Sequence, residues 1–170
     1  LQVTLTDTVG FIQDLPTELV SSFKSTLEES KNVDLLVHVI DASDPNHEEH
    51  EKTVLSIIKD LDMLEIPRLT LYNKADKVAD FTPTQTPFSL ISARSETARE
   101  DLQALLLEKL RELFVPFTIR VPFSKSYRTH DLETVAIIDQ REFEEDVEVI
   151  QGYIAEKNKW KLEEFYDGLR

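Results

Sequence analysis

Asn73, Lys74 and Asp76 form an N-K-x-D pattern at the end of the apolar run 67–72, and their side chains could together recognise a purine base. The Asp76 carboxylate can accept hydrogen bonds from guanine N1–H and N2–H₂ at once, whereas adenine has no such pair of donors at that edge. The Asn73 amide can tie neighbouring loops together, and the aliphatic stem of Lys74 can lie along the purine face. The pattern therefore predicts a guanine nucleotide as ligand.

Two further motifs flank this pattern in the order found in P-loop GTPases. Asp7-Thr8-Val9-Gly10 is a D-x-x-G motif after the strand-like segment 2–6, and Ser92-Ala93-Arg94 follows the apolar segment 88–91. In such enzymes the D-x-x-G aspartate belongs to the magnesium shell, its glycine N–H faces the γ-phosphate, and S-A-[KR] offers N–H groups to guanine O6. Each short motif alone is also an ordinary turn. Together they predict binding of GTP or GDP with Mg²⁺, the ion held by Asp7 through water. The residues expected to bind the nucleotide are Asp7, Gly10, Asn73, Lys74, Asp76, Ser92 and Ala93.

A longer stretch narrows the family. TDTVGFIQDLP at 6–16 runs on into LVSSFKSTLEE at 19–29, and VIDASDP follows at 39–45. These residues resemble the HflX family of translation-associated GTPases over about residues 1–115, and the remainder does so more loosely. The resemblance implies GTP hydrolysis with Mg²⁺, the large ribosomal subunit as partner and a cytoplasmic location. Two alternatives stay open: another tRNA-modifying or ribosome-assembly GTPase, and an interaction module that does not hydrolyse nucleotide.

Phe11 occupies the position directly after D-x-x-G, where many GTPases carry a glutamine that orients the attacking water. A phenyl ring cannot orient water, and HflX-like proteins share this hydrophobic replacement. Hydrolysis would then depend on other groups or on a partner surface that completes the site. We therefore assign no catalytic residue from the sequence.

The chain contains no G-x-x-x-x-G-K-[ST] motif, and its three glycines are Gly10, Gly152 and Gly168. That motif cradles the phosphates, so its absence removes the phosphate-binding half of the site. We expect the chain to begin just after switch I and to be the C-terminal half of a longer GTPase. By itself it should fold, be inactive, and bind GTP weakly or not at all.

Composition excludes several classes of protein. The chain has 170 residues, 41% of them hydrophobic, no cysteine and a net charge of −14. No apolar run approaches the length of a membrane span, so a soluble chain is expected. The acidity argues against a nucleic-acid clamp. One basic cluster, which could meet ribosomal RNA or protein, is the exception: Arg120, Lys125, Arg128 and His130.

The hydrophobic pattern predicts an α/β fold, a P-loop GTPase-like three-layer sandwich with a mainly parallel sheet. Strands are expected at about 2–7, 34–41, 67–73 and 86–92, alternating with helices at about 17–31, 47–64 and 97–114. Helices should cover both faces of the sheet, and no helix is expected between Lys77 and Pro87. We place this partial GTPase domain at 1–115.

Residues 116–170 are predicted to form a small α+β domain. Its expected elements are a strand at 118–123, a helix at about 127–139, a strand or hairpin at about 142–154 and a helix from about 156 with a buried Trp160.

Two further patterns resemble functional motifs, but we interpret both as ordinary parts of helices. His47 and His50 have metal-compatible spacing but no evident third ligand, so a solvated helix start is expected. Lys24-Ser25-Thr26 mimics the end of a P-loop, but it lies in a helical pattern.

Overall fold

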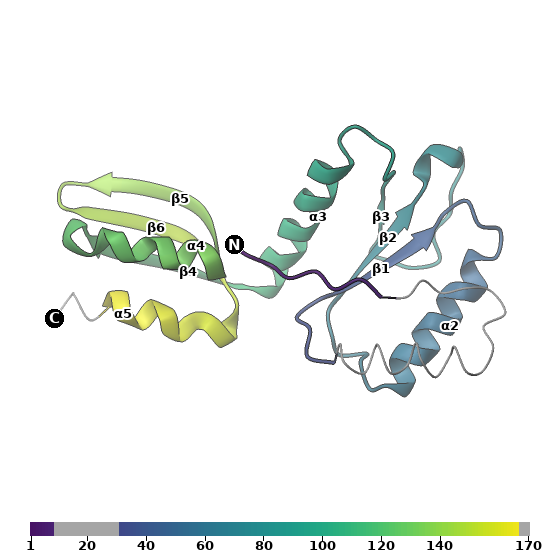
Figure 1. Cartoon of the computed structure of the whole chain (residues 1–170), viewed down its shortest axis with the longest axis horizontal. Helices are drawn as coiled ribbons and strands as arrows, with labels where there is room; N and C mark the ends of the chain where they lie inside the picture. The colour runs from purple at the N-terminus through teal and green to yellow at the C-terminus, as the bar shows by residue number, and fades with distance from the viewer. Residues whose placement is uncertain (9–30, 167–170) are drawn as a thin grey trace. The chain divides into compact units, whose positions relative to one another are not determined.

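A computed structural model describes residues 1–8 and 31–166 of the chain, which divides into two compact units. The first unit is Thr6–Leu106, and the second combines Leu1–Leu5 with Leu107–Arg170. Within the described residues each unit contains one three-stranded sheet (Figure 1). The predicted class, an α/β chain with a parallel sheet followed by a smaller α+β part, is confirmed.

The sheet of the first unit is parallel and consists of β1 (Leu36–Asp41), β2 (Arg68–Asn73) and β3 (Ser89–Leu90), in that spatial order. β1 and β2 pair over their full length, so that Asp41 lies opposite Asn73. β3 contributes only two paired residues. Because the strands are parallel, their carboxyl ends share one edge of the sheet, and the loops that leave them meet there.

Helix α2 (His47–Asp60) covers one face of this sheet and ends in a Schellman motif. Asp62 has a left-handed φ of 56°, and the N–H groups of Asp62 and Met63 donate to the carbonyls of Lys59 and Ile58, both at 3.0 Å. This turn ends the helix four residues before the predicted end at 64, because it folds Met63 back into the core. The core cluster beneath α2 is formed by Ile57, Ile58, Leu61 and Met63, with Leu36, Val54 and Ile66 packed against it.

The predicted strand at 2–7 is wrong. Residues 1–8 have no regular secondary structure, and the Gln2 N–H donates to the Thr134 carbonyl at 2.9 Å. No strand among the described residues pairs with this segment. An alternating pattern does not suffice, because a strand needs a neighbour to satisfy its backbone groups. The predicted helix at 17–31 and the Lys24-Ser25-Thr26 segment lie outside the described residues.

The remaining predictions for the first unit differ from the structure mainly at the ends of elements. Helix α3 is Ala98–Leu113, against a predicted 97–114, and the connection from 78 to 88 lacks a helix, as expected. A 3₁₀ turn, η1 (Ala75–Lys77), precedes that connection. Helices were expected to cover both faces of the sheet, but Val39 on β1 is 56% exposed, so one face is not fully covered at this position. Among the described helices, none is long and apolar enough to cross a membrane.

A buried polar cluster fastens the irregular connection after η1 to α2 and β2. Glu51 of α2 is 2% exposed and accepts a hydrogen bond from the Thr84 hydroxyl. The Tyr72 hydroxyl lies 3.1 Å from Thr84 Oγ1 and accepts the N–H groups of Thr84 and Gln85. His47 Nδ1 lies 3.4 Å from Glu51 Oε1. These bonds hold the connection without any helix, and burial raises the pKa of Tyr72.

The second unit contains an antiparallel sheet in the order β4-β6-β5, with short helices after β4 and after β6. Its elements in chain order are β4 (Val115–Pro122), η2 (Phe123–Arg128), α4 (Thr129–Val135), β5 (Ala136–Glu144), β6 (Val147–Ile154), η3 (Glu156–Leu162) and α5 (Glu163–Tyr166). Alternate residues of β4 face the core, as a half-buried strand requires. The core consists of Phe117, Ile119, Val121, Leu132, Ala136, Ile150, Ile154, Leu162 and Phe165.

Two predictions for this region are wrong. The helix expected at 127–139 ends at Val135, and residues 136–138 open β5, because Ile137 and Ile138 are β-branched and pair with β6. The hairpin therefore begins at 136, six residues earlier than predicted. The terminal helix forms mainly as 3₁₀, yet Trp160 is 58% exposed instead of buried. The proposed domain boundary at Val115–Pro116 stays a prediction.

Gly152 permits the close approach of β5 and β6. The register shifts between Ile138 and Gln140, and a Cβ at position 152 would lie 2.0 Å from the Ile137 carbonyl oxygen. We expect Gly152→Ala to destabilise the second unit by about 2–3 kcal/mol, because the strand pairing must move. Hydrogen exchange of the β6 amides measures this, with the exposed neighbour Gln151→Ala as control. Equal protection in the two variants would contradict the packing at this site.

His38 on β1 should make the stability of the first unit depend on pH. Its Nδ1 has no hydrogen-bond partner among the described residues, and burial lowers the pKa of His38 below its usual 6.5, with Glu51 opposing the shift. The unfolded chain then binds more protons than the folded one, so the free energy of unfolding falls as pH drops below about 6.5. Urea denaturation at a series of pH values from about 7 to about 5 measures this free energy. Its dependence on pH should be weaker in His38→Leu than in the unsubstituted chain.

The matched control for this experiment is Val39→Leu on the same strand, since Val39 is 56% exposed and has no titratable group. This control should keep the pH slope of the unsubstituted chain. An unchanged slope in His38→Leu would show that the buried imidazole does not carry the effect.

Candidate functional site

The N-K-x-D loop leaves β2 and is tied to the loop after β3 by the side chain of Asn73. Asn73 Oδ1 accepts the Lys74 N–H at 2.8 Å and the Ala93 N–H at 3.0 Å. The Ala75 N–H donates to the Ile91 carbonyl at 3.0 Å and forms a second link. One amide oxygen thus joins two loops that lie 20 residues apart in sequence. The structure brings together the predicted residues Asn73, Lys74 and Ala93.

Asp76 and Ser92 form the second contact between these loops. The Ser92 hydroxyl donates to Asp76 Oδ1 at 2.5 Å, and Asp76 is exposed. This hydrogen bond lowers the pKa of Asp76 below its usual 3.8. The carboxylate is therefore ionised at neutral pH and oriented by a neighbour. It can accept two parallel N–H donors from a planar ligand.

Lys74 is held by a residue that the sequence motifs did not identify. Its backbone is left-handed, with φ 65° and ψ 34°, and its Nζ lies 2.5 Å from Asp41 Oδ2. Burial alone would raise the pKa of Asp41, but hydrogen bonds from Lys74 and Ser43 outweigh it and lower that pKa to about 2. Asp41 belongs to none of the three nucleotide-binding motifs, although it lies in the stretch 39–45 that contributes to the family resemblance. Its position could have identified it. Asp41 and Asn73 end two predicted strands that are parallel neighbours, so their side chains are expected at the same edge of the sheet.

Of the predicted phosphate-side residues, the structure describes Asp7 alone. Asp7 is exposed and lies in a segment without regular secondary structure. Gly10 and Phe11 lie outside the described residues. Across the part of the chain that the structure describes, no group of three or more His, Asp or Glu side chains is arranged for a metal ion. Magnesium binding through Asp7 stays a prediction.

His47 and His50 at the start of α2 are both engaged with neighbours. The His47 side chain is 14% exposed, with its ring 5.3 Å from the ring of Phe81 and 6.1 Å from that of Tyr72. His50 Nδ1 lies 3.2 Å from Asp44 Oδ2. The expected solvated helix start is therefore wrong for His47, which packs against an aromatic cluster. Nothing in the geometry supports the metal-binding interpretation of this pair.

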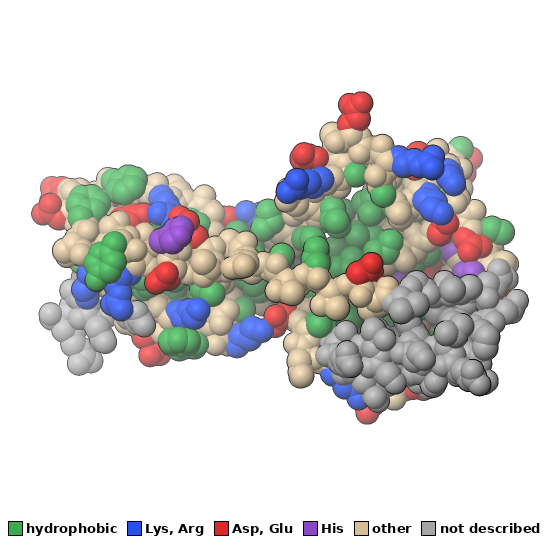
Figure 2. All heavy atoms as spheres, in the orientation of Figure 1, with side chains coloured by type: hydrophobic (Ala, Val, Ile, Leu, Met, Phe, Trp, Pro, Cys, Tyr) green, Lys and Arg blue, Asp and Glu red, His purple; other side chains and the backbone are tan. Residues whose placement is uncertain are grey.

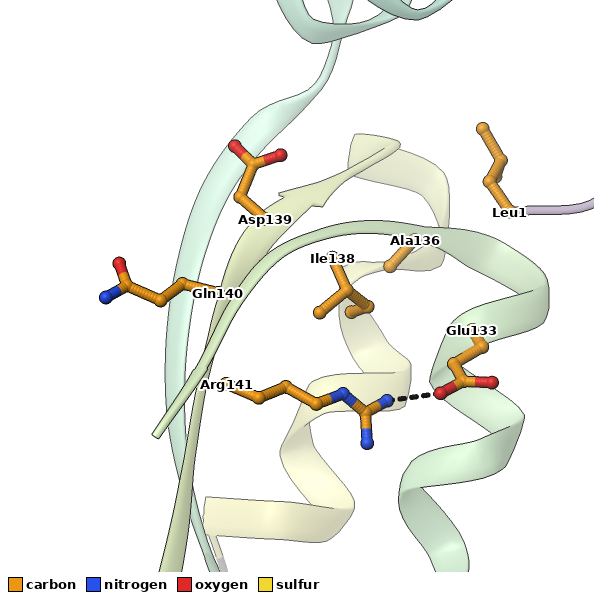
Figure 3. A pocket seen from close by; sticks show the side chains of 7 residues that line it. All are labelled: Leu1, Glu133, Ala136, Ile138, Asp139, Gln140 and Arg141. Atoms are coloured by element: carbon orange, nitrogen blue, oxygen red, sulfur yellow. Dashed lines mark hydrogen bonds and ion pairs between the residues drawn. The ribbon is translucent and has the colours of Figure 1, made fainter. Parts of the chain in front are cut away.

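The second unit contains an open hollow of about 480 Å³ beside the start of β5 (Figure 3). Its charged side chains already have partners: Arg141 pairs with Glu133 and with Glu148, and Asp139 pairs with Arg111 at 2.6 Å. The hollow therefore offers a ligand no unpaired charged side chain. Its lining consists of Leu1, Glu133, Ala136, Ile138, Asp139, Gln140 and Arg141.

Acidic and basic side chains are interspersed on the face shown in Figure 2. Within the predicted basic cluster, Arg120 forms an ion pair with Glu144 at 2.5 Å, and His130 Nδ1 lies 3.3 Å from Glu133. Two of its four members are therefore next to carboxylates. The local positive potential of the cluster is smaller than its composition suggested.

No known family model matches the chain, but curated relatives do. GTPase HflX of Alkalihalophilus pseudofirmus is 44% identical over 161 residues, covering 91% of this chain and 37% of that protein. GTPase HflX of Caldanaerobacter subterraneus subsp. tengcongensis is 34% identical over 165 residues, covering 96% of this chain and 38% of that protein. GTPase HflX of Escherichia coli K12 is 34% identical over 152 residues, covering 85% and 36%. This chain thus spans somewhat more than a third of the length of these relatives, and the alternative GTPase branches are not favoured.

Removing the Asn73 side chain should loosen the loop after β3. Asn73→Ala leaves the Lys74 and Ala93 N–H groups without their acceptor, so we expect faster hydrogen exchange at residues 92–95, by about five- to fiftyfold. Asn46→Ala is the matched control, because the Asn46 side chain makes no cap hydrogen bond. Unchanged exchange at residues 92–95 in Asn73→Ala would contradict the bridging role.

Proposed function

Since this chain belongs to the HflX family of GTPases along about nine-tenths of its length, we propose that it forms the guanine-recognising part of a GTPase. The observation that supports the proposal most is the double tie between the loops after β2 and β3, through Asn73 with Ala93 and through Asp76 with Ser92. These ties join the two loops that carry the base-side residues of the predicted nucleotide site. Loops joined in this way would lose less conformational entropy on binding, which would lower the cost of binding.

Asp76 is proposed to read the base edge. Its ionised carboxylate would accept guanine N1–H and N2–H₂, while the Ser92 hydroxyl keeps the carboxylate in place. Adenine lacks this pair of donors, so it leaves the carboxylate unpaired and is rejected. The site would therefore discriminate between bases because the wrong base leaves the Asp76 carboxylate without hydrogen bonds from the ligand.

Ala93 and Lys74 are proposed to contact the other parts of the base. In this structure the Ala93 N–H donates to Asn73 Oδ1, so guanine O6 would share that donor with the amide oxygen. The methylene stem of Lys74 would cover one purine face while its ammonium stays with Asp41.

Phosphate binding and hydrolysis are proposed for the whole protein. Asp7 and Gly10 would lie at the phosphate end, and the missing phosphate cradle would come from sequence beyond this chain. Asp7 would help to hold Mg²⁺ there, and the ion when bound would offset the negative charge of the phosphates. Because Phe11 cannot orient water, we propose that a partner surface helps to position it. By family resemblance that partner is the large ribosomal subunit, and the setting is the cytoplasm.

A chimera tests the proposal, with this chain replacing the matching segment of the Alkalihalophilus pseudofirmus protein. Asp76→Asn should weaken GTP binding by about a hundredfold or more, because two hydrogen bonds to a charged acceptor are lost. The amide can instead donate to xanthine O2, so xanthosine triphosphate should bind better than to the unsubstituted chimera. Equilibrium titration with fluorescent nucleotides measures both changes.

Asp80→Asn, an exposed carboxylate in the connection after η1, is the control and should leave both affinities unchanged. The chain alone should bind GTP only weakly, since it lacks the P-loop. Equal affinity of the unsubstituted chimera for GTP and ATP would overturn the proposed base recognition.

A further inference from the structure

Asp41 connects the rigid end of β1 to the base-side loop. Its Oδ2 lies 2.5 Å from Lys74 Nζ, and its Oδ1 accepts both the Ser43 N–H at 2.9 Å and the Ser43 hydroxyl at 2.7 Å. The three hydrogen bonds of this carboxylate are thus directed to one turn and one ammonium. The Ala42 N–H also donates to the Asn73 carbonyl at 2.9 Å, so the backbones of the two strand ends are joined as well.

The backbone conformation of Lys74 and its ion pair with Asp41 together restrict the Lys74 side chain. The backbone of Lys74 is left-handed, a region that non-glycine residues seldom adopt, and the Asn73 side chain accepts its N–H. The backbone therefore fixes where the side chain starts, while the ion pair fixes where it ends. Between these two points the methylene stem has few conformations left, although 45% of the side chain is exposed to solvent.

We propose that Asp41 is a positioning residue for nucleotide binding, which holds the stem of Lys74 in the plane where the purine face rests. This inference depends on the proposed function of the N-K-x-D loop and adds a residue that lies in none of its three motifs. Asp41 touches no part of the ligand and acts only through Lys74. Without it, binding must immobilise a long, free side chain, at a cost of about three- to tenfold in affinity.

The site of action predicts a distinctive pattern of affinities. Asp76 acts on the base edge, so its loss should affect guanine and hypoxanthine differently, because hypoxanthine lacks the 2-amino group. Asp41 acts on the base face through an aliphatic stem, which the two purines share. Asp41→Asn should therefore weaken GDP and IDP equally. A general disturbance of the loop would also displace Asp76 and change the ratio of the two affinities.

A double-mutant cycle in the chimera tests this. Asp41→Asn keeps the Ser43 contacts within reach but loses the charge, and Lys74→Met keeps an apolar stem but loses the ammonium. We expect Asp41→Asn to weaken fluorescent GDP and IDP by about three- to tenfold alone, and by less than about twofold when Lys74→Met is present. Asp44→Asn, on the same loop and outside the site, is the control and should change neither affinity.

Several outcomes would overturn the inference. An equal loss from Asp41→Asn with and without Lys74→Met would give Asp41 a structural role independent of Lys74, and no loss at all would give it none. Failure of the unsubstituted chimera to prefer GDP over ADP would reject the proposed function itself, a separate result. In this chain alone, NMR relaxation of the Lys74 methylene groups should show greater mobility in Asp41→Asn. Unchanged mobility would reject the anchor whatever the chimera does.

Discussion

Parallel pairing of β1 with β2 is the constraint on which the base-side cluster depends. The pairing sets Asp41 opposite Asn73, and parallel direction brings the following turn of each strand to the same edge. The Asp41–Lys74 ion pair spans 33 residues of sequence and exists only because of that register. A shift by one residue would turn each side chain to the other face of the sheet.

The third strand shows where backbone pairing gives way to side chains. β3 forms only two pairs with β2, which is a short ladder for positioning a loop. The remaining alignment comes from Asn73 and Asp76, whose side chains bind the backbone or hydroxyl groups of the loop after β3. Residues assigned to ligand recognition are therefore also structural residues of this corner. The local fold and the proposed base-binding geometry use the same atoms.

Much of the first unit could be predicted because its elements are strongly periodic. The apolar stripe of α2 and the run before Asn73 specify their own structure, and loops after parallel strands must meet. Predictions of secondary structure were wrong where a residue distant in sequence determines the structure of a segment. Residues 2–7 alternate like a strand but have no strand to pair with, whereas Ile137 and Ile138 continue a helical pattern but pair with β6. His47 looks polar in sequence, yet its ring packs in an aromatic cluster.

The buried cluster around Glu51 closes a ring of contacts through the first unit. The chain runs from Asp41 through α2 to Glu51, then through space to Thr84 and Tyr72, and along β2 to Asn73, which lies opposite Asp41 again. A closed ring is over-determined, because each segment is fixed from both ends. Loss of any one contact leaves the other path intact, so the spacing between the two strand ends tolerates single defects that an open arrangement would not.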